Sequence, residues 1–401
     1  MNLGGAGVYR GVGGELTLLA MQDEPRRRWG VWCLVCVAII RLAVFITGVV
    51  ALYVAAPEDL GLMAPKFPWI AWDGPYYRDM VVSGYPTGST DFNVGLFPIY
   101  PFVSRALAVL TGPDVALLVV ANIGSLLGLL VLYRWAKLVT DSETAFWSAL
   151  VAAVYPPAVF LSAAYGEGPL LLCAASVLLL LQRKREWGAA LVSAGATALK
   201  ATGVAVAMLV ALWELVYGHG KAVSRLTRSA LLGLTGAAGF IGFQIYLSYR
   251  YGHPELFLFS HLSRVRSVVW DSVTSAPMGQ QGHVRLRMFD GLLPAPLDKV
   301  FSFGAWCRFF IALIVALAVV GLLRPGRIPR AAFALPLFIA ALGWWCGTSL
   351  ARFETAALPC FLLVASWLVP SHRRLGFAVV SGSLAFELLF AVGFARGTWM
   401  G

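Results

Sequence analysis

Two acidic residues, Asp73 and Glu167, lie in short polar breaks of a chain that is otherwise strongly hydrophobic. Around the first, residues 71–86 read AWDGPYYRDMVVSGYP, and the pair Gly74-Pro75 favours a turn that presents the carboxylate on a rigid bend. A carboxylate held there could act as a general base on a sugar hydroxyl. The alternative is a structural role, with Asp73 as a helix cap and Trp72 as an interfacial aromatic residue.

The second carboxylate ends the stretch SAAYGE at residues 162–167. Just upstream, Tyr155-Pro156-Pro157 is expected to kink an apolar helix, because proline cannot donate a backbone hydrogen bond. Glu167 is the only acid near that boundary. It is therefore either a charge at the end of a membrane span or a second site carboxylate.

Two cations lie at comparable breaks. Lys200 separates two short apolar runs, and Arg352 follows the turn GTSLA at residues 347–351. A pair of cations near a membrane surface suits a lipid phosphate group. The alternative for each is to anchor the end of a span by extending its side chain towards water.

The composition places these residues in a membrane protein. Hydrophobic residues make up 59% of the chain and charged residues only 13%, with a mean hydropathy of +0.77. Soluble domains carry about a quarter charged residues. Long unbroken apolar runs such as 170–181 favour helices over the alternating pattern of a barrel. The net charge of +11 comes from short basic clusters between apolar runs, which indicate membrane topology and not nucleic-acid binding.

The sequence thus predicts an all-α polytopic membrane protein with about eleven transmembrane helices. Residues 1–30 are expected to form a disordered cytosolic tail, and residues 31–401 a single transmembrane domain. The expected spans are 31–55, 114–133, 145–163, 168–182, 187–199, 203–218, 229–249, 301–322, 331–347, 350–369 and 375–395.

A charge-based topology gives the orientation in a plasma membrane. With the amino terminus in the cytosol, every short basic cluster lies in a cytosolic loop, as the positive-inside bias requires. The same count places a large first loop, residues 56–113, and a second loop, residues 250–300, on the extracytoplasmic side. It also places the breaks around Glu167, Lys200 and Arg352 on that side. All candidate residues therefore lie on one extracytoplasmic face.

Five motifs, taken in order, resemble one family. They are the W-D, aromatic pair and S-G-Y of residues 72–85, then LFPIYP at 96–101, SAAYGE at 162–167, KATG at 200–203 and SLARF at 349–353. This series resembles the PIG-V-like mannosyltransferases of the GT-C superfamily of membrane-embedded glycosyltransferases. The composition, rich in alanine, glycine, arginine and valine, is typical of a GC-rich bacterium such as an actinobacterium.

The resemblance implies a GT-C fold and polyprenyl phosphate mannose as the donor, used on the extracytoplasmic side with inversion at the anomeric carbon. It implies Asp73 as the general base with Glu167 as a second catalytic carboxylate, and Lys200 and Arg352 as the residues that bind the donor phosphate. Trp72, Tyr76, Tyr77 and Tyr165 are the aromatic residues expected to bind substrate. The sequence departs from the family at Ala71, where a basic residue is usual, and at Lys200, which replaces an arginine and loses its bidentate geometry.

No cofactor or metal is expected, because the leaving group is already a phosphate and no ligand cluster is present in the sequence. The motifs D-x-D, Walker loop, G-x-S-x-G and H-E-x-x-H are also missing from it. Two other function classes stay open: a transporter or flippase of a lipid-linked sugar, and a membrane scaffold without an active site. The acceptor, whether lipid, glycan or protein, is left undetermined.

Overall fold

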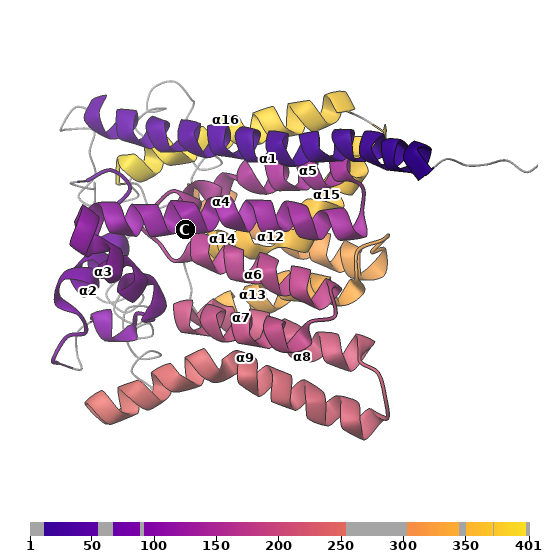
Figure 1. The fold of residues 1–401 in the computed structure, drawn as a ribbon. Helices are drawn as coiled ribbons and strands as arrows, with labels where there is room; N and C mark the ends of the chain where they lie inside the picture. Colours follow the sequence, from indigo (N-terminus) through magenta and orange to yellow (C-terminus); the bar gives the residue numbers. More distant parts are fainter. Residues whose placement is uncertain are drawn as a thin grey trace, which may run out of the picture.

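A computed structural model of the chain describes residues 12–54, 67–88, 92–253, 303–344, 350–371 and 373–397. Within these ranges the regular elements are all helices, and they pack side by side along a roughly common direction (Figure 1). Most of the second predicted loop, residues 254–300, lies outside the described residues, as do residues 55–66 and 89–91 of the first.

The helices follow the apolar runs. In the described part of the chain, four helical segments are long and apolar enough to cross a membrane: Arg28–Val54, Pro113–Val139, Ala222–Tyr251 and Arg373–Ala395. The prediction of an all-α polytopic membrane protein is confirmed. The α-helices are α1 Val12–Val54, α2 Gly74–Ser83, α3 Ile99–Thr111, α4 Pro113–Val139, α5 Ser142–Ala153, α6 Glu167–Gln182, α7 Glu186–Leu199, α8 Val204–Tyr217, α9 Ala222–Tyr251, α12 Phe303–Leu323, α13 Ala334–Trp344, α14 Leu350–Phe353, α15 Leu358–Ser371 and α16 Arg373–Ala395.

Helix α1 begins earlier than expected. Residues 12–30 were predicted to belong to a disordered tail, but the structure places them in α1. Leucine, alanine, methionine and glutamate in this stretch favour helix, and the apolar span that follows extends it without a cap or a break. The helix thus includes residues 12–30 of the expected tail, and residues 1–11 lie outside the described part of the chain.

Small residues bring α4 and α6 close together at the centre of the bundle. A Cβ atom at Gly124 would overlap Pro169, and one at Gly128 would overlap Leu171. Glycine at these positions therefore allows the two backbones to approach, as small residues commonly do between membrane helices. This contact fixes the amino-terminal end of α6, where Glu167 lies.

The span predicted at 145–163 is interrupted. Helix α5 ends at Ala153, and Pro156–Leu161 forms a 3₁₀ turn, η3. The two prolines explain the change, because they lack an N–H and disfavour helix in the residue before them. Pro157 cannot donate to the Ala153 carbonyl, and the change to a 3₁₀ turn leaves further carbonyls without α-helical partners inside an apolar bundle, where each unpaired group is costly.

Buried polar side chains satisfy these carbonyls. Arg41 of α1 donates to the carbonyl oxygens of Ala153 at 3.0 Å and Ala158 at 2.9 Å. From α4, the Ser125 hydroxyl donates to the Leu161 carbonyl at 2.7 Å. Arg41 also forms a 2.5 Å ion pair with Glu387 of α16, and both side chains are buried. The pair therefore ties α1 and α16 to the interrupted segment.

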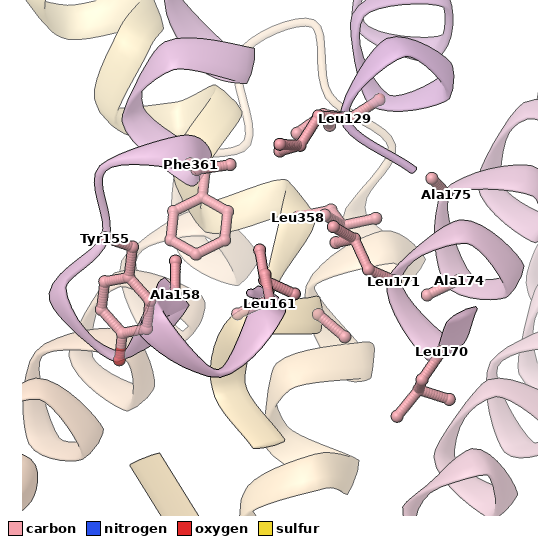
Figure 2. Packing of buried hydrophobic residues seen from close by; sticks show 14 of the residues in the cluster. Leu129, Tyr155, Ala158, Leu161, Leu170, Leu171, Ala174, Ala175, Leu358 and Phe361 are labelled. Carbon is pink, nitrogen blue, oxygen red and sulfur yellow. The ribbon is translucent and has the colours of Figure 1, made fainter. Parts of the chain in front are cut away.

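Apolar packing surrounds the same segment (Figure 2). Leu161 of η3 lies near Leu171 of α6 and Leu358 of α15 in a cluster of buried side chains. Nearby, Tyr155 packs against Phe361 of α15 with ring centroids 5.3 Å apart. The broken helix is thus held on all sides, and it delivers residues 162–167 to one end of the bundle.

Candidate active site

Helices α2 and α3 lie together at one end of the bundle (Figure 1), and Asp73 directly precedes α2. It occupies the N-cap position of α2, but its side chain makes no capping hydrogen bond. Instead, its Oδ2 forms an ion pair with Nη1 of Arg352 at 2.7 Å. The helix-cap alternative therefore does not account for this carboxylate, which is only 8% exposed.

The segment that leads to Asp73 has an uncommon backbone. Trp69 and Trp72 adopt positive φ angles of 68° and 58°, which bulky residues rarely do. Tertiary contacts hold Trp69 in this conformation: its indole N–H donates to the Phe45 carbonyl at 3.0 Å, and its own carbonyl accepts from the Ala164 N–H at 3.0 Å. Backbone strain of this kind persists only where the surroundings impose it, and it is common at functional sites.

Tyr165 fixes the backbone on both sides of Trp72. Its hydroxyl donates to the Ala71 carbonyl at 3.1 Å and accepts from the Asp73 N–H at 3.2 Å. The side chain is fully buried, and burial raises the pKa of Tyr165 well above its usual range, so that it stays neutral. Tyr165 therefore supports Asp73 through hydrogen bonds, and its expected contact with substrate stays a prediction.

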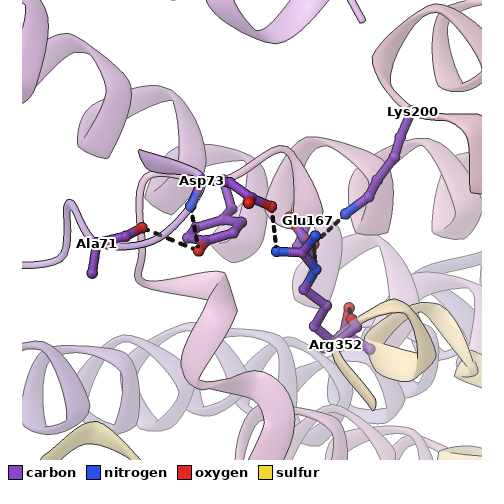
Figure 3. A network of polar contacts seen from close by, with 7 residues as sticks. Ala71, Asp73, Glu167, Lys200 and Arg352 are labelled. Atoms are coloured by element: carbon purple, nitrogen blue, oxygen red, sulfur yellow. Dashed lines mark hydrogen bonds and ion pairs between the residues drawn. The ribbon is translucent and has the colours of Figure 1, made fainter. Parts of the chain in front are cut away.

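Four charged residues meet in one buried cluster (Figure 3). Arg352 contacts Asp73 through Nη1 and Glu167 through Nε, the latter at 3.3 Å. Lys200 donates from Nζ to the same Glu167 Oε1. The four side chains come from the amino-terminal ends of α2 and α6, the end of α7 and the short helix α14. The structure thus brings together all four of the predicted charged site residues.

The charges of this ion cluster, Asp73, Glu167, Lys200 and Arg352, balance. Two carboxylates face two cations, and Glu167 contacts both of the cations. Burial lowers the pKa of Lys200 to about 8, although the nearby Glu167 acts in the opposite direction. Glu167 is the first residue of α6, where the helix dipole also favours a negative charge.

Aromatic rings line the cationic side of the ion cluster. The Lys200 ammonium lies 4.2 Å from the ring centroid of Phe353, and the Arg352 guanidinium lies 5.0 Å from that of Tyr165. Such cation–π contacts stabilise a cation that has left bulk water. Phe353, which is not among the predicted site residues, is recognisable in the sequence only as the neighbour of Arg352.

The other predicted aromatic residues differ in exposure. Tyr77 is buried, with its ring packed edge-on against Tyr100 at 4.9 Å and Tyr165 at 6.4 Å. It is therefore part of the support around the ion cluster. Trp72 and Tyr76 are half-buried beside it, in positions where a substrate could still reach them.

Four buried charges in the described part of the chain are not among the predicted site residues: Arg41, Glu214, Glu354 and Glu387. Glu354 follows Arg352 by two residues and is 0% exposed, and neither carboxyl oxygen has a hydrogen-bond partner among the described residues. The signal that could have found them is a charge inside an apolar run, which is rare in membrane spans. No group of three or more His, Cys, Asp or Glu side chains in the described part of the chain could hold a metal ion.

No protein-family model and no curated protein matches the sequence. Among solved structures, the chain is similar to the oligosaccharyltransferase of Archaeoglobus fulgidus, with a TM-score of 0.49, 12% identity, and coverage of 90% of this chain and 53% of that one. It is also similar to ArnT of Cupriavidus metallidurans bound to undecaprenyl phosphate, with a TM-score of 0.43, 16% identity, and coverage of 91% and 78%. The chain spans about half the length of the archaeal enzyme. Likeness at this level defines neither family nor activity, so the site itself carries the functional argument.

Proposed function

We propose that this chain is a membrane glycosyltransferase of the GT-C type, which transfers a mannosyl residue from a polyprenyl-phosphate-linked donor to an acceptor hydroxyl. The observation that carries the proposal is the convergence of Asp73, Glu167, Lys200 and Arg352. These residues come from distant motifs of the sequence, and each motif belongs to the series that resembles the PIG-V-like enzymes.

In the proposed reaction, Asp73 removes the proton of the acceptor hydroxyl as that oxygen attacks the anomeric carbon. The bond between this carbon and the phosphate oxygen breaks, polyprenyl phosphate leaves, and the configuration inverts. Tyr165 and the Trp69–Trp72 backbone hold the carboxylate in place for this step. A general base of this kind contributes about 10²–10⁴-fold to the rate.

Lys200 and Arg352 are proposed to stabilise the charge on the leaving phosphate. Fixed cations in a site with little water stabilise developing negative charge much more strongly than in water. Both cations contact Glu167, and Arg352 also contacts Asp73, so a bound phosphate has to share or replace a carboxylate partner. Glu167 is accordingly proposed to hold the two cations at the correct separation.

The proposed orientation follows from charge. Basic loops between the helices favour a cytosolic amino terminus in the plasma membrane, which puts the end of the bundle that carries Asp73 on the extracytoplasmic side. On this basis residues 31–401 form a single transmembrane domain, with outer loops at residues 56–113 and 250–300. The acceptor is reached from that side.

A flippase would need charged groups along a path through the middle of the membrane. Arg41 and Glu387 lie at that depth, but they are only 3% and 0% exposed. The Arg41 guanidinium is also bound to backbone carbonyls and to the Ser162 hydroxyl at 2.5 Å. Its contacts describe a structural support, and they favour the transferase over the flippase.

The test uses the full-length protein in vesicles, supplied with radiolabelled polyprenyl phosphate mannose and a membrane lipid extract. Asp73→Asn is compared with Asp79→Asn, a matched control because Asp79 lies on the same helix and is exposed. We expect label in a new product with the wild type and the control, and at least about 100-fold less with Asp73→Asn. Normal turnover in Asp73→Asn would exclude Asp73 as the base, and unmodified donor crossing the bilayer would establish the flippase instead.

A further inference from the structure

A groove of about 550 Å³ lies between α1 and α4, outside the ion cluster. Its walls are mostly apolar, formed from side chains such as Leu42, Phe45, Val115 and Val119, and Arg41 and Asn122 are the two polar residues among them. Leu42 is 58% exposed and Val115 41% exposed, so the groove opens to the outside of the bundle. Because α1 and α4 both contain candidate membrane spans, the surroundings of this opening are lipid hydrocarbon.

The length of the groove matches one leaflet. It extends along α1 from Ala38 to Val49 and along α4 from Val115 to Leu126. Each stretch is about 16 Å long at 1.5 Å per residue. The hydrocarbon core of a bilayer is about 30 Å thick, so the groove reaches from the membrane surface to about the midplane. Phe67 and Pro68 form its end on the side of the candidate active site.

We propose that this groove binds one acyl chain of a glycerophospholipid from the leaflet on the side of the active site, as a lipid that is retained and not consumed. The donor is a less suitable occupant, because a lipid with its phosphate at Lys200 and Arg352 would have to reach the groove past Trp69, which is 2% exposed and bonded to Phe45. A peptide segment is disfavoured, because Arg41 and Asn122 already donate to backbone carbonyls of the protein and leave the backbone of a bound peptide few hydrogen-bond partners.

A series of contacts links the groove to the catalytic carboxylate. Phe45 lines the groove, and its ring stacks on that of Trp69 with centroids 5.8 Å apart. Trp69 donates to the Phe45 carbonyl and accepts from the N–H of Ala164. The next residue, Tyr165, bonds the backbone of Asp73. An acyl chain against Phe45 therefore supports the segment that positions Asp73.

The same contacts explain why the bound lipid is not a reactant. The residues that line the groove do not include Asp73 or any other member of the ion cluster. Trp69 and Tyr165, which connect the two places, are 2% and 0% exposed. Packed aromatic side chains, and not open space, thus join the groove to the site.

The first test is photo-crosslinking of the full-length protein in phosphatidylglycerol vesicles that contain a phosphatidylglycerol with a diazirine at the end of one acyl chain. Leu42→Trp combined with Val119→Trp fills the groove. Ile39→Trp combined with Ile123→Trp is the matched control, since both residues are exposed on the same helices but do not line it. We expect crosslinks concentrated near Ala38 and Leu126, at least about tenfold weaker in the filled variant and unchanged in the control. Equal labelling of groove and exposed positions would show annular lipid only and overturn the proposal.

The second test measures sugar transfer by the same variants, and only this readout rests on the proposed function. We expect the filled variant to lose about tenfold in kcat with the KM for the donor unchanged, because the lipid positions Asp73 and does not bind the donor. Groove crosslinks in a wild-type protein without transferase activity would refute the proposed function and leave the lipid site intact. Sugar label on the phosphatidylglycerol itself, or unchanged kcat in a variant that has lost the crosslinks, would overturn the proposed role.

Discussion

Replacement of Glu167 by glutamine is expected to destabilise the protein strongly. One oxygen of this carboxylate contacts both the Lys200 ammonium and, at 3.3 Å, the Arg352 guanidinium, and the residue is 1% exposed. A pair of unit charges about 4 Å apart is worth about 4 kcal/mol at an effective dielectric constant near 20. Arg352 keeps Asp73 as a partner, but Lys200 loses its only carboxylate contact among the described residues. Breaking a buried pair in this way costs about 3–5 kcal/mol, and we expect Glu167→Gln to lower the free energy of unfolding by that amount.

The control is a double variant that removes one positive and one negative charge from the ion cluster. Lys200→Met leaves Glu167 paired with Arg352, and the double variant Glu167→Gln/Lys200→Met restores the charge balance of the ion cluster. The double variant should therefore be more stable than the sum of the single losses predicts, with a coupling free energy of about 1–3 kcal/mol. Unfolding in mixed detergent micelles, followed by tryptophan fluorescence, measures all four proteins. Strict additivity would refute the electrostatic account of the ion cluster.

Three further predictions follow from contacts around the site. Tyr165→Phe and Tyr100→Phe each remove the hydrogen bonds of a buried hydroxyl, and each should lower the free energy of unfolding by about 1–3 kcal/mol. Only Tyr165→Phe should also lower kcat, because only the Tyr165 hydroxyl bonds the backbone beside Asp73. Burial lowers the pKa of Lys200 to about 8, so its charge is present below that pH and lost above it. The KM for the donor should therefore rise as the pH increases through 8. Lys200→Arg should flatten this pH dependence, because arginine stays charged. Arg41→Met should lower the free energy of unfolding by about 3–5 kcal/mol in the same detergent unfolding assay. If adding Glu387→Met restored the wild-type stability, the hydrogen bonds from Arg41 to the backbone carbonyls would contribute nothing.

The helices could be predicted because hydropathy is a local property. Each expected span is at least about 13 residues of apolar sequence, and each overlaps a helix in the described part of the chain, although the span expected at 350–369 is divided between α14 and α15. The prolines at 156 and 157 predict a kink, but the sequence does not show that α5 ends at Ala153. How far a broken helix continues depends on which tertiary partners take up its carbonyls, and these come from α1 and α4.

The candidate site was predictable as a group of residues but not as a geometry. Counting spans places the breaks at Asp73, Glu167, Lys200 and Arg352 at one end of the bundle, and there the structure brings them into contact. The pairing of carboxylates with cations depends on helix packing, which periodicity does not encode. For the same reason the hydrogen bonds of Tyr165 to the backbone beside Asp73 could not be predicted.

Arg41 shows why a charge in a membrane helix should be judged by its partners. It lies midway along the span Arg28–Val54, where an unpaired guanidinium would be costly. Here it forms hydrogen bonds with Ala153, Ala158 and Ser162 and an ion pair with Glu387. The break in the neighbouring helix, which the prolines cause, leaves carbonyl acceptors for Arg41, so the charge and the break compensate each other. A charged residue in one apolar run and a proline pair in another, taken together, therefore predict that the charged side chain bonds the carbonyls of the broken helix. Neither feature predicts this contact alone.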